Sequence, residues 1–240
     1  MPSLHETSIL RAGVLGAWLT AGGALVSGPL SFALVEATHP QPPWQGAETF
    51  VRSFHPIQTV PFFCGFMLLS GFAVLIATLH ALAPARLRVR TTTALIFTAA
   101  FVTLISFNYI VQTTFVPGMV SDDSRAQDFA ITLFSMSCPS SLAWALEMWG
   151  YALLGAATWL IAPVLHETAI ERATGWLLTA NGPLSIGPAV LMAFSPGWVL
   201  APAGIISFVV WNVLVIGLGV LAALSLRRRL HPSTERQVTL

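Results

Sequence analysis

Residues 12–35 read "AGVLGAWLTAGGALVSGPLSFALV", a run of 24 residues without a charged side chain. A helix that rises about 1.5 Å per residue needs about 20 apolar residues to cross the hydrocarbon core of a bilayer. The apolar core of a secretory signal peptide is shorter, at about 7–15 residues. The run therefore predicts a retained membrane-spanning helix.

Five further apolar runs are long enough to span a membrane. The composition agrees with this, because 55% of the residues are hydrophobic and only 9% are charged, whereas a soluble domain carries about 25% charged residues. We predict an all-α polytopic integral membrane protein, a six-helix bundle that forms one transmembrane domain over residues 1–240. The polar residues 227–240 are predicted to be a mobile cytoplasmic tail. The predicted spans are 12–36, 57–83, 92–119, 141–164, 173–194 and 200–226.

Prolines in the first, second and fifth predicted spans bear on the shape of these helices. Proline lacks a backbone N–H, and its ring clashes with the carbonyl four residues earlier, so it kinks or breaks a helix. We expect Pro29 to bend the first span and Pro61 to bend the second. Pro183 and Pro188 interrupt the fifth span, which we expect to be the least regular.

The arginines predict the orientation, because positively charged residues gather in the cytoplasmic loops of membrane proteins. With the N-terminus in the cytoplasm, nine arginines fall on the inner side and two on the outer side. The inner arginines are Arg11, Arg86, Arg88, Arg90, Arg172, Arg227, Arg228, Arg229 and Arg236, and the outer ones are Arg52 and Arg125. We therefore predict a multi-pass protein of the cytoplasmic membrane with both termini in the cytoplasm.

The outer loop from Val120 to Ser140 contains a helical pattern of apolar residues. Its members follow the i, i+3, i+4, i+7, i+8 spacing of one helix face, and they are Ala126, Phe129, Ala130, Leu133 and Phe134. Asp122 or Asp123 is a suitable N-cap. We predict a short amphipathic helix that lies along the outer surface of the membrane. The alternative is an irregular loop packed on the bundle.

Polar side chains from four of the predicted spans share the outer half of the membrane. Glu147 lies about six residues, or about 9 Å, inside the fourth span, and Asn108 and Gln112 share one face of the third. A charged residue at the membrane centre costs at least about 2.5–3.5 kcal/mol, so Glu147 needs partners or water. The residues predicted to bind a ligand are Glu147, Asn108, Gln112, Trp144, Tyr151, Gln58 and Glu36.

Two interpretations of Glu147 stay open. In one, its carboxyl group is a hydrogen-bonded buttress between the third and fourth spans. In the other, it lines an outward-opening cavity and meets a ligand or a proton. We favour the second, because four helices contribute polar groups to the same leaflet and ionisable residues inside membranes are usually functional. The sequence then predicts a non-enzymatic protein that binds or moves a small or amphiphilic ligand.

Other function classes leave little trace in the sequence. It contains no glycine-rich phosphate loop and no nucleophile elbow. We predict no catalytic residue, no metal site, no cofactor and no nucleic-acid partner; the expected partners are the lipid bilayer and the ligand, and the oligomeric state stays open. The alternatives are a membrane-embedded enzyme that uses Glu147 with His39 or His55, and a structural subunit of a membrane complex.

Two segments with related sequences stand in the first and fifth spans. "LTAGGALVSGP" (19–29) and "LTANGPLSIGP" (178–188) match at seven of eleven positions without a gap. An old duplication of a helix pair would explain the match. Chance similarity between segments rich in Gly, Ala and Leu would explain it equally well.

The layout of the fourth and fifth spans resembles that of one protein family. The segment "EMWGYALLG" (147–155) is followed by a short turn and by "ERATGWLLTANG" (171–182). In the acidic–Trp–Gly pattern of Glu147, Trp149 and Gly150, the chain is similar to a bacterial family of uncharacterised six-span membrane proteins known only as a domain of unknown function. The resemblance implies a six-span fold and brings no site residues with it.

Overall fold

The computed structural model describes residues 3–121 and 125–231, and every regular element among them is a helix. Six helical segments are long and apolar enough to cross a membrane, which confirms the predicted all-α six-helix bundle. These segments are Leu4–Thr38, Pro56–Ala81, Ala85–Val120, Leu142–Val164, Ala169–Phe194 and Pro202–Leu230.

Several of these segments contain more than one element. In chain order the elements are α1 (Leu4–Leu25), η1 (Val26–Leu30), α2 (Ser31–Thr38), α3 (Ala47–Ser53), η2 (Pro56–Thr59), α4 (Val60–Ala81), η3 (Ala85–Leu87), α5 (Arg88–Ile110), η4 (Val111–Phe115), α6 (Val116–Val120), α7 (Arg125–Phe134), α8 (Leu142–Ile161), η5 (Ala162–Val164), α9 (Ala169–Phe194), η6 (Pro196–Leu200) and α10 (Pro202–Leu230). The side chains of Ser3, Ser141 and Thr168 cap the starts of α1, α8 and α9, as hydroxyl residues commonly do.

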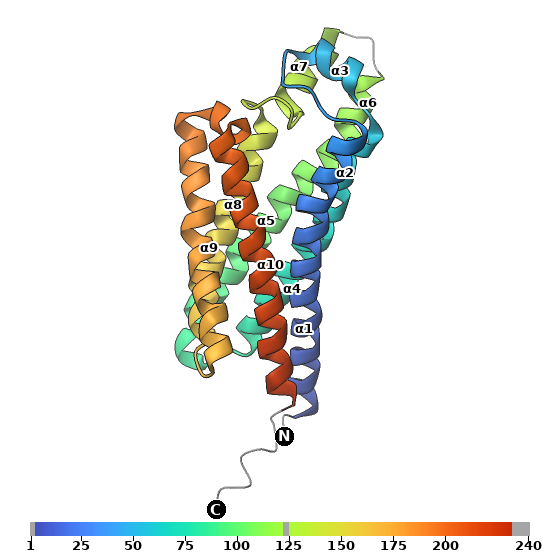
Figure 1. Cartoon of the computed structure of the whole chain (residues 1–240). Coiled ribbons are helices and arrows are strands. Elements are labelled where there is room, and N and C mark those ends of the chain that lie inside the picture. The colour runs from blue at the N-terminus through green and yellow to red at the C-terminus, as the bar shows by residue number, and fades with distance from the viewer. Residues whose placement is uncertain (1–2, 122–124, 232–240) are drawn as a thin grey trace, which may run out of the picture.

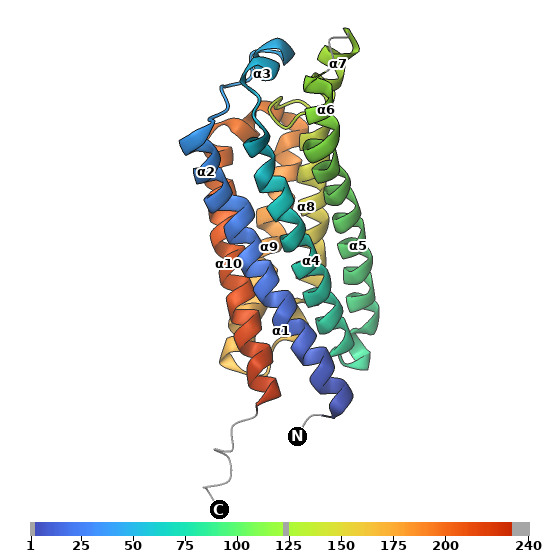
Figure 2. The ribbon, with the colours of Figure 1, turned by 90° about the vertical axis from the view of Figure 1, so that its right-hand side faces the viewer.

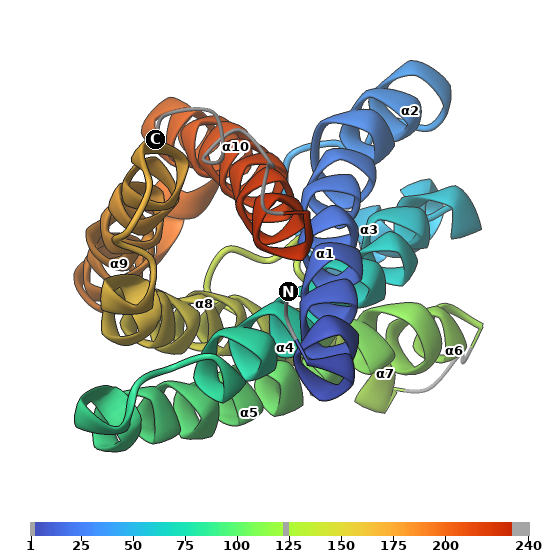
Figure 3. The same cartoon turned by 90° about the horizontal axis from the view of Figure 1, so that it is seen from below.

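The six long helices form a closed ring. Each packs against two neighbours, in the order α1, α4, α5, α8, α9, α10 and back to α1 (Figure 3). The start of α1 and the end of α10 lie at the same end of the bundle, which we call the terminal end (Figure 1). An even number of crossings requires this arrangement.

The opposite end of the bundle carries a cap, formed by α3, α6 and α7 (Figure 2). In the cap, α7 packs against both α3 and α6. The cap has a small apolar core of its own, which consists of Ala47, Phe50, Val111, Val116 and Ile131. The loop before α3 is tied to the loop before α8 by a hydrogen bond from Gln41 Nε2 to Ser137 Oγ.

The prolines do not all act as predicted. Pro29 lies in the π-helical turn η1, where Gly28 leaves the helical region (φ −90°, ψ −106°), so the predicted bend of the first span is confirmed. Pro61 lies at the start of α4, where its missing N–H has no helical partner to lose, and it does not bend the helix. Pro183 and Pro188 lie inside α9, which runs unbroken from Ala169 to Phe194. The prediction that the fifth span is the least regular is therefore wrong.

The predicted outer-loop helix is present as α7, but its buried face differs from the prediction. Ile131 is fully buried, whereas Phe129, assigned to the apolar face, is 72% exposed. The reason is that α7 packs on α3 and α6 in the cap, and these partners select which side of the helix is buried. The two predicted caps, Asp122 and Asp123, lie outside the described residues.

At the terminal end, α10 is longer than the predicted sixth span. The helix continues through Arg227, Arg228 and Arg229 to Leu230, so the first residues assigned to the tail are helical. Residues 232–240 of the predicted tail lie outside the described part of the chain.

Candidate binding site

Glu147 lies near the cap end of α8, with its side chain turned into the protein. The helix begins at Leu142, where the Ser141 hydroxyl accepts a hydrogen bond from the backbone N–H of Trp144. Glu147 follows five residues later, and only 8% of its surface is exposed. The indole Nε1 of Trp144 donates to the carbonyl of Met136 at 2.6 Å, which fixes the loop that covers this end of α8.

The carboxylate of Glu147 accepts two hydrogen bonds from α5. Asn108 Nδ2 donates to Oε2 at 2.8 Å, and the Tyr109 hydroxyl donates to Oε1 at 3.3 Å. The Tyr109 hydroxyl also lies 3.1 Å from the hydroxyl of Tyr151, one turn further along α8. These four residues, with Gln112, form the polar cluster.

Gln112 joins the polar cluster to the cap. Its Nε2 donates to Asn108 Oδ1 at 3.3 Å and to the carbonyl of Phe134 at 2.7 Å, and its Oε1 accepts from the backbone N–H of Met136 at 3.2 Å. Gln112 stands in the π-helical turn η4, directly after α5. Such turns are rare and occur frequently at functional sites.

Aromatic rings pack against the two tyrosines of the polar cluster. Phe62 and Phe66 of α4 pack against Tyr109, with ring centroids 5.6 and 5.8 Å apart. Tyr151 meets the indole of Trp211 on α10 edge to face, at 4.8 Å. Four helices of the ring thus contribute to one cluster of carboxyl, amide and aromatic groups.

Within residues 3–121 and 125–231, no cationic side chain is paired with Glu147. The ion pairs of this part of the chain lie elsewhere, between Arg52 and Glu48 in the cap and between Arg229 and the acidic residues Glu167 and Glu171 at the terminal end. The carboxylate is therefore held only by neutral hydrogen-bond donors.

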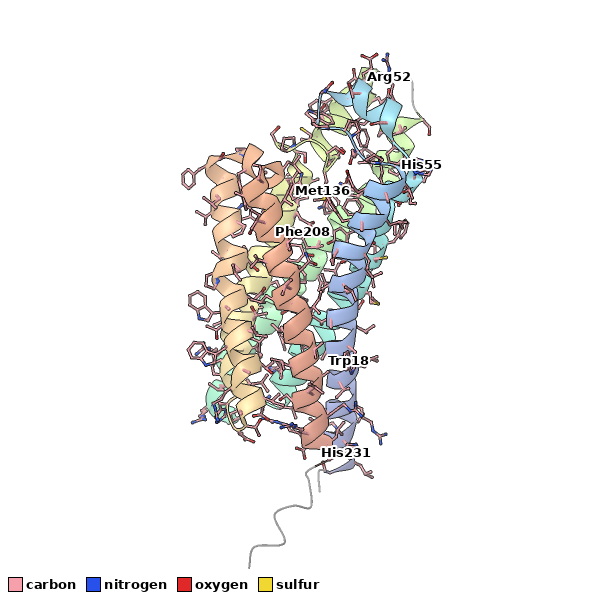
Figure 4. All side chains as sticks on the ribbon, viewed as in Figure 1. Trp18, Arg52, His55, Met136, Phe208 and His231 are labelled. Carbon is pink, nitrogen blue, oxygen red and sulfur yellow. The ribbon has the colours of Figure 1, made fainter. Side chains whose placement is uncertain are left out.

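Figure 4 locates the cluster along the bundle. From the cap downwards the labelled residues follow the order Arg52, His55, Met136, Phe208, Trp18 and His231. Met136, whose Sδ lies 3.5 Å from Asn108 Nδ2, stands in the half of the molecule nearer the cap. The cluster belongs to that half.

The structure brings together five of the seven residues predicted to bind a ligand. Glu147, Asn108, Gln112 and Tyr151 belong to the polar cluster, and Trp144 holds the adjacent loop. The sequence analysis did not select Tyr109, although it contacts both Glu147 and Tyr151. The sequence could have indicated Tyr109 through its neighbour Asn108. Two adjacent residues on one helix can both reach a side chain that lies between them on the facing helix.

The other two predicted residues lie apart from the polar cluster. Gln58 is buried in η2, directly before α4, where its Nε2 donates to the carbonyls of His39 and Ser53 and its Oε1 accepts from the N–H of His55. Glu36 is exposed on α2. Both were predicted to lie at a depth similar to that of Glu147, but among the described residues neither side chain forms a hydrogen bond with the polar cluster.

His39 and His55 lie side by side. Their imidazole rings stack in parallel, with centroids 3.5 Å apart and an interplanar angle of 8°. His55 Nδ1 accepts a hydrogen bond from the backbone N–H of Ile57, so this ring nitrogen caps the start of η2. The described residues contain no group of three or more potential metal-ligating side chains.

Two hollows on the described surface lie in the cap. One is lined by Gln41, Trp44 and Ser137 among others, and the second, of about 320 Å³, by Glu48, Arg52 and Gln127 among others. Glu147 lines neither of them.

Comparisons of the chain with protein-family models, with curated proteins and with solved structures find no match.

Proposed function

We propose that this six-span protein binds, or moves across the membrane, a small or amphiphilic ligand at the polar cluster around Glu147. The observation that carries the proposal is a buried carboxyl group held only by neutral donors from α5. The ligand-contacting residues would be Glu147, Asn108, Gln112, Trp144 and Tyr151, together with Tyr109.

A purely structural role explains this choice of residue poorly. A hydrogen bond between membrane helices contributes about 0.6 kcal/mol on average, whereas a carboxylate at the membrane centre costs at least about 2.5 kcal/mol. Glutamine at position 147 would accept a hydrogen bond from Asn108 through its Oε1 and donate one to the Tyr109 hydroxyl through its Nε2, without a charge. A carboxyl group adds the ability to bind a proton or a positively charged group, which favours a functional role.

The proposal also covers the location of the protein. The distribution of arginines supports insertion into the cytoplasmic membrane with both termini in the cytoplasm. The cap then lies on the outer side, in contact with the lipid headgroups and the aqueous phase. The polar cluster belongs to the outer half and would receive its ligand from that side or from the outer leaflet.

Native mass spectrometry of the protein released from mild detergent tests the binding proposal. The wild type is expected to retain a small-molecule adduct that Glu147→Gln loses, while both keep the same thermal unfolding midpoint. Glu48→Gln is the matched control, because it neutralises an exposed carboxylate of the cap and should keep the adduct. The absence of an adduct from both the wild type and Glu147→Gln, with equal stability, would assign Glu147 to packing.

A further inference from the structure

We infer that the ligand of the polar cluster is a lipophilic monovalent cation, bound by the Glu147 carboxylate in exchange for a proton. This inference rests on the proposed function, and it specifies the chemical class of the ligand. Three features carry it: the charge of the site, its aromatic rings and its hydrogen-bond pattern.

The charge of the site requires a positive partner. A carboxylate buried in apolar surroundings is stabilised either by a proton or by a cation. The donors that reach Glu147, Asn108 Nδ2 and the Tyr109 hydroxyl, are both neutral. A monovalent cation that replaces the proton keeps the total charge of the site constant: the O–H bond of the acid breaks, the proton leaves to water, and the carboxylate pairs with the cation.

The aromatic rings suit a large, weakly hydrated cation. Cations are attracted to the faces of Trp, Tyr and Phe rings, most strongly when they are desolvated. Rings from three helices converge beside Glu147, namely Phe66 on α4, Tyr109 on α5 and Tyr151 on α8, and Trp211 of α10 packs on Tyr151. The indole of Trp211 is fixed by a hydrogen bond from its Nε1 to Ser185 Oγ at 3.1 Å.

The two tyrosine hydroxyls allow the site to hold either form of the carboxyl group. With a carboxylate, Tyr109 donates to Glu147 and accepts from Tyr151. With a carboxylic acid, the acid donates to Tyr109, and Tyr109 donates to Tyr151. The distances of 3.3 and 3.1 Å fit both directions, because a hydroxyl group is a donor and an acceptor. The proton can therefore leave without any hydroxyl losing its partner.

The partial exposure of two aromatic side chains also distinguishes this site from a closed core. Tyr151 and Trp211 are only partly buried, unlike Asn108, which is fully buried. A cation would therefore approach the carboxylate past these two rings, which would have to turn aside to admit it.

The test uses two probes of equal shape and opposite charge, tetraphenylphosphonium and tetraphenylborate, with tetrabutylammonium as a second cation. Binding to the full-length purified protein is followed by calorimetry and by quenching of tryptophan fluorescence. We expect the wild type to bind the cations and not the anion. In weakly buffered, mildly acidic solution it should release one proton for each cation bound.

The variants separate the carboxylate from the rings. Glu147→Gln should weaken cation binding by about 30-fold or more, since it removes one member of a buried charge pair. Tyr151→Leu should weaken binding by about fivefold. Glu48→Gln should bind as the wild type does. The thermal unfolding midpoint of each variant checks that a loss of binding is not caused by a loss of folding.

Three outcomes would overturn the inference: equal binding of cation and anion, unchanged cation affinity in Glu147→Gln, or no binding of either cation by the wild type. In each case an adduct in native mass spectra that depends on Glu147 would still support the proposed function with a ligand of another class. Absence of both cation binding and the adduct would reject both proposals.

Discussion

Asn108 takes part in more hydrogen bonds than any other side chain of the polar cluster. Its Nδ2 donates to Glu147 Oε2 at 2.8 Å and to the carbonyl of Ala143 at 3.2 Å, and its Oδ1 accepts from Gln112. It is fully buried on α5. One amide thus links α5, α8 and, through Gln112, the loop that closes the cap.

Asn108→Leu should therefore destabilise the protein. The substitution leaves Glu147 Oε2 without its hydrogen-bond donor, and an unsatisfied buried group costs about 1–3 kcal/mol. The measurement is the free energy of unfolding in mild detergent. Thr103→Val is the control, because this exposed hydroxyl on α5 bonds only to the carbonyl of Ala99. Equal stability of the two variants would show that the cluster does not support the fold.

Two ion pairs of the chain differ in burial and should differ in their contribution to stability. Arg229 Nε lies 2.7 Å from Glu171 Oε1, and the Glu171 side chain is only 2% exposed, whereas the side chains of Arg52 and Glu48 are 77% and 78% exposed. Arg229→Leu strands a buried carboxylate and should cost about 2–3 kcal/mol. Arg52→Leu should change stability by less than about 1 kcal/mol. Unfolding free energies of the two variants test this difference, and similar losses would contradict it.

At the scale of elements, glycines set the distance between α1 and α4. A Cβ atom at Gly23 would lie 2.5 Å from the backbone nitrogen of Leu68 and 2.6 Å from its Cα. A Cβ atom at Gly71 of α4 would clash with the backbone of Leu19 and Thr20. Small residues at such positions let membrane helices approach closely.

Gly23→Ala and Gly22→Ala should therefore have different effects on stability although the two positions are adjacent. At Gly23 the added methyl group forces α1 and α4 apart, at a cost of about 1–3 kcal/mol. At Gly22 the nearest atom is Met67 Cε, at 3.6 Å, so the change should be neutral or stabilising by up to about 1 kcal/mol through helix propensity. Thermal unfolding midpoints compare the two, and equal shifts would refute the close contact.

The related segments 19–29 and 178–188 show how context decides the backbone. The first changes into a π-helical turn at Val26–Leu30, while the second continues as α-helix through both of its prolines. A Cβ atom at Gly28 would collide with the side chain of Asn212, whereas nothing lies within 4 Å of one at the matching Gly187. Similar sequences therefore have different surroundings in the ring, and the question of an old duplication stays open.

For the molecule as a whole, the closed ring puts the cap and the termini at opposite ends. The orientation of this axis in the membrane is a prediction from the arginines. Cysteine labelling tests it, after replacement of the native Cys64 and Cys138 by alanine. Thr132→Cys on α7 should react with a membrane-impermeant maleimide in intact cells, and His231→Cys only after permeabilisation. The reverse pattern would place the cap in the cytoplasm.

Much of the architecture follows from the sequence alone. Six apolar runs of membrane-span length fix the number of crossings, because an apolar helix of about 20 residues satisfies its own backbone in lipid. The even number of crossings places both termini on one side. Counting residues also gives the depth of Glu147, Asn108 and Gln112 along their spans. This similar depth was enough to predict that the three residues share a site.

The ring order, the cap and the final membership of the site depend on tertiary structure. Residue counting gives depth but not which helices are neighbours, so Gln58 and Glu36 were grouped with Glu147 and Tyr109 was omitted. The buried side of α7 depended on its contact with α3 and α6, and the effect of each proline depended on its position within a helix. Lateral packing decides these features, because apolar helices in lipid present several similar faces and only side-chain fit selects among them.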